Sequence, residues 1–411
     1  MSAATSSARA AGTSGDLPTV TFRSSFTADA IDKALITGGW ESLPNEMLFD
    51  LGEVQFADPS GLLYLAAVVT SLTERGVTIK LDLPRSKKVR DLMRRYRFGS
   101  TLNKLIEPHA TELLTDGSLA YTEEAPLYYL ASRRGVRPTT SQKRALTRLS
   151  SFLVSQEPSQ EAAIEGMNWW MDQDLKTLLE RVLGSKAALI APGIVYEALS
   201  NAASHPDASR LISTGFLDER ARGGKGMLTI AIWDNGKSIV STLKAALGAG
   251  SSLRMNEAGN RRAGSSELNL YFDWYGLFEG DSPGARKQLT KLLYSGDSPD
   301  HEASDAELLV SSAFPGITSN PWRQPDESSI HGPHHNQPGM GLYILTSLAI
   351  DSFGGEVLLR TDSLYANFKR APRELQEQHR CRYRVGVVQN PAMGSYLRGN
   401  HLVVRLPLIS G

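Results

Sequence analysis

The run Leu228-Thr-Ile-Ala-Ile-Trp233, followed by Asp234-Asn-Gly236, is the stretch of the chain on which its fold assignment depends. Its apolar and β-branched residues predict a central strand, and Asp234 stands where that strand ends. A carboxylate there can accept a hydrogen bond from the exocyclic amine of adenine, and Gly236 lets the backbone turn close to the base. A plain strand-to-turn junction is the alternative, because Asp-Asn-Gly is also favourable turn chemistry.

A second polar motif lies upstream, in Glu197-Ala-Leu-Ser-Asn201-Ala-Ala-Ser-His205. Pro192 suits a first helical turn and Pro206 discourages helix beyond His205. Glu197 and Asn201 stand four residues apart, so their side chains project from the same face of the predicted helix. An amide oxygen is a hard ligand for Mg²⁺, and a carboxylate can orient or deprotonate a nucleophile. An ordinary amphipathic helix with a polar stripe remains the alternative.

A third motif lies downstream, in Gly339-Met-Gly341-Leu342, which precedes an apolar run at 343–350. That run predicts a helix. Glycines that open a helix expose backbone N–H groups and the positive end of the helix dipole, and both favour phosphate. The same Gly-x-Gly spacing occurs elsewhere in the chain, but only here does a convincing apolar helix follow it.

The order of the three motifs resembles the GHKL superfamily, which includes the gyrase, heat-shock chaperone, histidine kinase and mismatch-repair ATPases. The stretch 197–205 is similar to the N-box of the histidine kinases, 234–236 to the adenine-binding G1 box, and 339–342 to the G2 box. The resemblance implies an α/β (α+β) fold at 145–411, a two-layer sandwich that binds ATP and Mg²⁺. The runs at 353–359 and 402–408 look like its closing strands.

The resemblance also implies roles for individual residues. Asn201 binds Mg²⁺, Glu197 is the general base or orients water, and Asp234 holds adenine. The other residues expected to line the nucleotide pocket are Gly236, Gly339, Gly341, Leu342 and His205. His205 could instead simply end its helix. Ser238 stands where the family has a second G1 glycine, which is a departure from the pattern.

About a hundred residues separate Gly236 from Gly339, and the family places its ATP lid in this region. Loops longer than about 15 residues are unusual in a compact domain unless they are functional or disordered. Expected helices at 267–278 and 285–294 make the segment of about 240–336 a structured insertion. We expect it to close over ATP as a lid, and a family-specific decoration is the alternative.

The first hundred residues show a different pattern, in which short apolar runs alternate with helical segments. Strands are expected at 19–22, 47–51 and 77–83, and helices at 28–35, 61–74 and 86–96. Gly52 is expected to end the second strand, and Arg75-Gly76 to stop the second helix. Strands that alternate with helices over so short a span predict a small α/β sandwich at 19–105.

This front segment resembles the STAS domains of anti-sigma factor antagonists. The resemblance rests on Asp58-Pro59-Ser60-Gly61 and on the later Lys87-Lys-Val-Arg-Asp-Leu-Met93. It implies a domain that protein partners recognise. In the family that it resembles, the serine directly after the aspartate is phosphorylated. That position is Pro59 in this chain, which cannot be phosphorylated, and Ser60 is the only nearby hydroxyl. Whether Ser60 is phosphorylated stays open, with a fixed docking surface or a simple scaffold as the alternatives.

Length and composition limit the remaining possibilities. A chain of 411 residues favours two domains. Its 44 basic and 44 acidic residues cancel, so neither a nucleic acid nor a membrane partner is expected. Cys381 is the only cysteine and excludes an intrachain disulfide. Residues 1–18 are expected to form a disordered tail without a secretory signal, which favours a cytoplasmic location.

Two further segments complete the division of the chain. Residues 106–144 are expected to connect the front domain to the GHKL-like domain, and helices are expected at 143–154 and 162–183. A histidine autokinase is not expected, because His109 is the only histidine before His205 and lacks the His-Glu or His-Asp signature of a phosphoacceptor.

Two functions stay open at this stage. The first is a cytoplasmic regulatory ATPase, or a kinase that transfers phosphate to a Ser or Thr of a partner, in signalling similar to partner switching. The second is an ATP-gated interaction or dimerisation module with little or no catalysis. Both imply protein partners at the STAS-like domain and the lid, and both allow a homodimer. A degenerate module that binds no nucleotide is a third reading.

Overall fold

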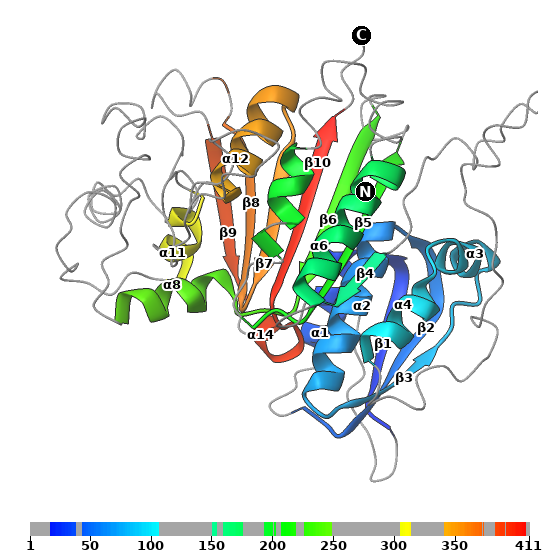
Figure 1. The fold of residues 1–411 in the computed structure, drawn as a ribbon. Coiled ribbons are helices and arrows are strands. Elements are labelled where there is room, and N and C mark those ends of the chain that lie inside the picture. The colour runs from blue at the N-terminus through cyan, green and yellow to red at the C-terminus, as the bar shows by residue number, and fades with distance from the viewer. Residues whose placement is uncertain are drawn as a thin grey trace, which may run out of the picture.

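The computed structural model of the chain describes residues 17–37, 43–106, 150–153, 159–175, 193–199, 201–202, 207–218, 226–248, 305–313, 341–371, 373, 383–390 and 392–407. Figure 1 shows a small sheet, formed near the N-terminus, beside a larger sheet built from later parts of the chain. Both sheets carry helices, so the chain is an α/β protein, as the sequence predicts.

The N-terminal residues form a parallel sheet of three strands in the order β1-β2-β3. Its strands are β1 (Thr19–Phe26), β2 (Glu46–Ala57) and β3 (Thr78–Asp82). Its helices are α1 (Ala28–Thr37), α2 (Pro59–Glu74), α3 (Lys87–Arg95) and α4 (Phe98–Ile106). We call these elements the front module. The prediction that Gly52 ends the second strand is wrong, because β2 continues through Gly52 to Ala57 and pairs with β1 over that length, across two irregularities of register.

Helix α2 has clear signals at both ends. Asp58 is its N-cap, with Oδ1 accepting a 2.6 Å hydrogen bond from the backbone N–H of Gly61, and Pro59 occupies the first helical position. Beyond the last turn, Gly76 takes a φ of +83°, which a glycine adopts without strain. Every residue from Pro59 to Leu72 is buried. A helix that is apolar on all sides needs neighbours on all sides.

The larger sheet has seven strands, in the order β4-β5-β6-β10-β7-β8-β9, and every neighbouring pair is antiparallel. The strands are β4 (Ser150–Leu153), β5 (Arg210–Asp218), β6 (Met227–Asp234), β7 (Glu356–Thr361), β8 (Leu364–Arg370), β9 (Tyr383–Gln389) and β10 (Asn400–Pro407). The predicted helix at 143–154 is wrong over its last part, because Ser150–Leu153 pairs with β5 as a strand. Pairing across the sheet overrides the local pattern there.

Helices cover one face of this sheet (Figure 1). They are α6 (Ser159–Trp170) with the π-helix η2 (Met171–Leu175), α8 (Ile239–Gly248), α11 (Asp305–Ser311), and α12 (Gly341–Ser347) with the π-helix η4 (Leu348–Ser352). Residues 193–199 and 201–202 are also helical, and we call them the Asn201 helix. We call the apolar contacts between these helices and the sheet the helix-side core. A short helix, α14 (Met393–Tyr396), precedes β10.

Two described parts of the predicted lid insertion, α8 near its start and α11 within it, belong to the helix-side core. Leu243 of α8 and Leu308 and Leu309 of α11 are buried in it. An ion pair of 2.5 Å joins Lys244 of α8 to Asp305 of α11. The helices predicted at 267–278 and 285–294 lie outside the described residues, so the lid stays a prediction.

The opposite face of the larger sheet is covered by the front module, through α2. Ile212, Ala231 and Trp233 of the sheet share one apolar cluster with Leu62 and Leu65 of α2, and we call this cluster the junction core. Helix α2 contacts β3 on one side and β5 and β6 on the other. The predicted two-layer sandwich therefore has a further layer here, which the sequence did not indicate.

A buried arginine of the larger sheet also binds the front module. Arg360 of β7 has a side chain only 2% exposed, and its Nε donates to Asp32 Oδ2 of α1 at 2.9 Å. Its Nη2 donates to Asp29 of the same helix. Asp32 Oδ1 also accepts hydrogen bonds from the hydroxyls of Tyr64 (2.5 Å) and Tyr396 (2.9 Å). The carboxylate of Asp32 is thereby held by groups from both halves of the fold.

Among the described residues, no helix has both the length and the apolar character needed to cross a bilayer.

Candidate functional site

Strand β6 directs Asp234 toward the helices. Leu228, Ile230 and Ile232 pack in the helix-side core, whereas Ala231 and Trp233 pack in the junction core. Successive side chains of a strand point to opposite faces, so Asp234 lies on the same face as Ile232. The Asn201 helix covers that face too, with Ile194, Ala198 and Ala202 among the residues of the helix-side core.

The carboxylate of Asp234 is buried and held by neighbouring groups. Its Oδ1 accepts hydrogen bonds from Gly236 N at 3.0 Å and from Asn400 Nδ2 at 3.1 Å. The amide oxygen of Asn400 in turn accepts from Thr361 Oγ1 at 2.7 Å and from Ile239 N at 3.1 Å. These bonds fix which end of the Asn400 amide faces Asp234. Gly236, the other predicted residue of this motif, is buried beside it.

Asn400 and Thr361 are polar residues of the site that the sequence analysis missed. They stand opposite each other on β10 and β7, and Asn400 stands opposite Asp234 on β6. Only the register of three strands, far apart in the chain, brings them together. No local pattern could have indicated the pairing.

Gly399 closes tightly over the backbone of Asp234. It has a φ of +83°, and a Cβ at this position would lie 1.8 Å from the carbonyl oxygen of Asp234. The atoms approached belong to the backbone and cannot rotate away. A glycine is therefore required here both for its conformation and for the space beside Asp234.

Asn201 and Gly341, which belong to two different predicted motifs, are in contact. A Cβ on Gly341 would lie 2.4 Å from Asn201 Oδ1 and 2.6 Å from its Nδ2. The first turn of α12 therefore approaches the amide of Asn201 as closely as only glycine allows. The structure thus brings together the N-box-like and G2-like motifs, on the face of the sheet to which Asp234 points.

The other predicted site residues are placed as follows. Glu197 is 4% exposed and lies one helical turn before Asn201. Leu342 is partly buried and packs against the helix-side core. His205 and Gly339 lie outside the described residues.

Ser238, which departs from the family pattern, has a structural role. Its Oγ accepts a 2.9 Å hydrogen bond from Ser241 N, and its carbonyl accepts one from Thr242 N at 3.0 Å. This is the geometry of an N-cap, and Ser238 immediately precedes α8. Its hydroxyl also donates to Asp362. A serine at this position therefore begins a helix of the helix-side core.

A magnesium site built from several carboxylates is not seen in the part of the chain that the structure describes. There, His, Cys, Asp and Glu side chains form no group of three or more that could hold a metal. Mg²⁺ in nucleotide sites commonly keeps several waters and takes one or two protein ligands together with phosphates. The single amide oxygen of Asn201 fits that mode of binding.

Ser60, the hydroxyl considered for phosphorylation, is covered in this structure. It is 5% exposed, and its Oγ donates a 2.6 Å hydrogen bond to Asp58 Oδ1. Burial raises the pKa of Asp58, and the hydrogen bonds from Ser60 and Gly61 oppose that shift. The start of α2 therefore offers no exposed hydroxyl at Ser60 in this structure.

Comparisons of the chain with models of known protein families, with curated proteins and with solved structures gave no match.

Proposed function

We propose that this chain is a regulatory protein that binds Mg-ATP in the manner of the GHKL ATPases, over the face of the larger sheet where the Asn201 helix meets the start of α12. The observation that carries the proposal is the contact of Gly341 with Asn201, on the face of the larger sheet to which Asp234 points. Each motif alone has an ordinary structural explanation. Their convergence on one face supports a shared ligand.

The residues present suit the parts of the nucleotide. Asp234 would accept a hydrogen bond from the adenine amine, and Asn400 holds its carboxylate in place. Asn201 would bind the Mg²⁺ that neutralises the phosphates. Glu197, on the same side of the helix as Asn201, would take a proton from the attacking group. The STAS-like front module would present the nucleotide state to protein partners.

Two reactions are compatible with these residues. In hydrolysis, water attacks the γ-phosphorus, the bond to the β–γ bridging oxygen breaks, and Glu197 takes the proton of the water, which gives ADP and phosphate. In transfer, the hydroxyl of a Ser or Thr of a partner replaces the water, and a phosphoprotein forms. The second candidate function, an ATP-gated interaction module, needs neither step. The apolar cluster shared by the front module and the larger sheet favours this second function, because it would couple nucleotide binding at the sheet to partner binding at the front module.

Binding is tested first, by titrating Mg-ATP into the full chain in a calorimeter. We expect Asp234→Asn to weaken binding about 10- to 150-fold, because a hydrogen bond to a charged group contributes about 1.5–3 kcal/mol. The matched control is Asp91→Asn on α3, which removes one carboxylate far from the site and should bind as the wild type does. Absence of binding by the wild type would refute the proposal and leave the nonbinding module.

Catalysis is tested separately, by following the γ-phosphate of labelled Mg-ATP in the wild type and in Glu197→Ala. Label released as phosphate by the wild type only would identify an ATPase that uses Glu197. Label retained on protein in acid-stable form would identify a Ser/Thr kinase. If the label stays on ATP while calorimetry shows binding, the gated interaction module is the remaining function.

A further inference from the structure

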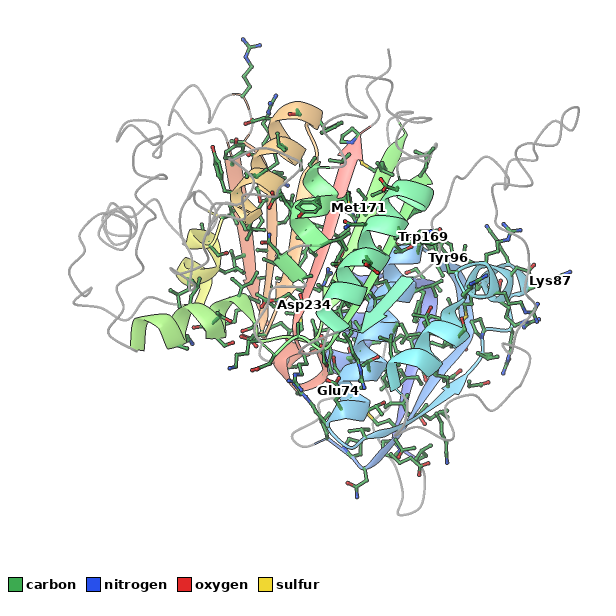
Figure 2. All side chains as sticks on the ribbon, in the orientation of Figure 1. Glu74, Lys87, Tyr96, Trp169, Met171 and Asp234 are labelled. Atoms are coloured by element: carbon green, nitrogen blue, oxygen red, sulfur yellow. The ribbon has the colours of Figure 1, made fainter. Side chains whose placement is uncertain are left out.

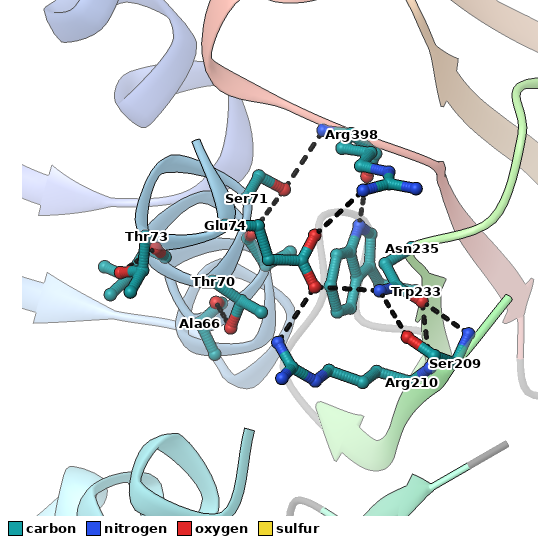
Figure 3. A network of polar contacts seen from close by, with 12 residues as sticks. Ala66, Thr70, Ser71, Thr73, Glu74, Ser209, Arg210, Trp233, Asn235 and Arg398 are labelled. Atoms are coloured by element: carbon teal, nitrogen blue, oxygen red, sulfur yellow. Dashed lines mark hydrogen bonds and ion pairs between the residues drawn. The ribbon is translucent and has the colours of Figure 1, made fainter. Parts of the chain in front are cut away.

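The residue after Asp234 binds the front module. Nδ2 of Asn235 donates a 2.9 Å hydrogen bond to Oε1 of Glu74, the last residue of α2. The same oxygen accepts a 2.8 Å hydrogen bond from Nη1 of Arg210, at the start of β5. Figure 2 places Glu74 and Asp234 at the same end of the larger sheet, and Figure 3 shows the Glu74 carboxylate between its partners.

The amide of Asn235 is fixed at both ends. Its Oδ1 accepts hydrogen bonds from the backbone N–H groups of Ser209 (2.9 Å) and Arg210 (2.8 Å). Its Nδ2 donates to Ser209 Oγ at 2.9 Å as well as to Glu74. The turn between Asp234 and Gly236 is therefore tied to the start of β5 and, through Glu74, to α2.

The same end of α2 also binds the segment 394–398, which directly precedes two residues that contact Asp234. Ser71 Oγ accepts a hydrogen bond of 3.0 Å from Arg398 N, and Glu74 Oε2 forms a 3.6 Å ion pair with Arg398 Nη1. Arg75 donates to the carbonyls of Gly394 (2.9 Å) and Ser395. This segment leads directly into Gly399 and Asn400, which contact the backbone and the carboxylate of Asp234.

The contacts of Glu74 are largely removed from solvent. The side chains of Glu74 and Arg210 are 16% and 17% exposed. Charge-assisted hydrogen bonds in such surroundings are shorter and stronger than those between neutral groups. Loss of the carboxylate would leave Arg210 and Asn235 without their shared acceptor, and the turn beside Asp234 would lose one of its supports.

We propose that Glu74 is a positioning residue for the candidate nucleotide site, so that Asp234 is held in place for binding only while the front module occupies the sheet. This inference rests on the proposed function. Glu74 touches no part of the nucleotide and acts through Asn235. A partner that drew α2 away from the sheet would thereby weaken ATP binding, and ATP would oppose such a partner by the same factor.

The test measures Mg-ATP affinity by calorimetry for the wild type and for Glu74→Ala, Glu74→Gln and Asn235→Ala. We expect Glu74→Ala to weaken binding about 5- to 150-fold, the usual range of coupling between sites. Glu74→Gln keeps an acceptor for Asn235 and Arg210, and should weaken binding less than about fivefold. The matched control is Glu53→Ala, which removes an exposed carboxylate of the front module, 3.7 Å from Arg23, and should bind as the wild type does.

Two further results distinguish positioning from general loss of structure. Circular dichroism must show each variant folded at the temperature of the titration. If Glu74→Ala does not fold, Asn235→Ala carries the test, because it removes the amide through which Glu74 would act. If Glu74 acts through Asn235, the double variant with both alanines should bind no more weakly than Asn235→Ala alone. Wild-type affinity in folded Glu74→Ala would overturn the inference and leave the proposed function intact, whereas no binding by the wild type would overturn both.

Discussion

Replacement of Arg360 by methionine is expected to lower the free energy of unfolding by about 3–5 kcal/mol, the usual cost of removing one partner of a buried ion pair. The side chain of Arg360 is 2% exposed and binds Asp32, whose side chain is 14% exposed. Without the guanidinium, the partners of the Asp32 carboxylate within the described part of the chain are the hydroxyls of Tyr64 and Tyr396. A buried negative charge would then lack its counter-charge.

The measurement is chemical denaturation followed by circular dichroism, and the control is Arg23→Met. Arg23 is also an arginine of an ion pair, but its side chain is 55% exposed and its contact with Glu53 is 3.7 Å. Exposed ion pairs contribute about 0–1 kcal/mol to stability, so the free energy of unfolding of Arg23→Met should stay close to that of the wild type. Equal small losses in both variants would show that Arg360 does not hold the front module to the sheet.

The second large effect is expected for Gly399→Ala. Gly399 and Gly76 have the same φ of +83°, but a Cβ on Gly76 would meet nothing within 4 Å. Gly76→Ala should therefore cost only the backbone strain, about 1–2 kcal/mol. Gly399→Ala has the same backbone strain and also places a Cβ 1.8 Å from the carbonyl oxygen of Asp234. Overpacking of this kind costs about 1–3 kcal/mol in addition.

The comparison of these two glycine variants separates the cost of the positive φ from the cost of the steric collision. Denaturation curves measured side by side should place Gly399→Ala below Gly76→Ala in stability. Gly399→Ala should also lose affinity for Mg-ATP, because the added methyl group displaces the backbone that carries Asp234. Equal stabilities would mean that the segment at Gly399 shifts without cost, and the tight closure over Asp234 would then be unimportant.

Local signals in the sequence were sufficient for several elements. The apolar run before Asp234 predicts β6, and the run after Gly341 predicts α12. The predicted helix at 61–74 was two residues short at its start, where Asp58 caps α2 and Pro59 begins it. In each case the residues that decide the element lie within it or directly beside it.

Other parts of the fold depend on pairing between distant residues. Strands β5, β8 and β9 were not predicted, and Ser150–Leu153 was expected to be helical. The contacts of Asp234 with Asn400, of Asn235 with Glu74 and of Arg360 with Asp32 join residues more than 150 positions apart. No window of the sequence contains both partners. The candidate site residues could be proposed from motifs, but the distant residues that hydrogen-bond to them could not.

Helix α2 has a consequence for how the sequence of this chain can vary. A helix with one face in water accepts many substitutions on that face, because only the other face must fit its neighbours. Every residue of α2 from Pro59 to Leu72 is buried, between β3 on one side and β5 and β6 on the other. A change that improves the fit to one sheet must also fit the other, so the two halves of the chain cannot diverge independently at this helix.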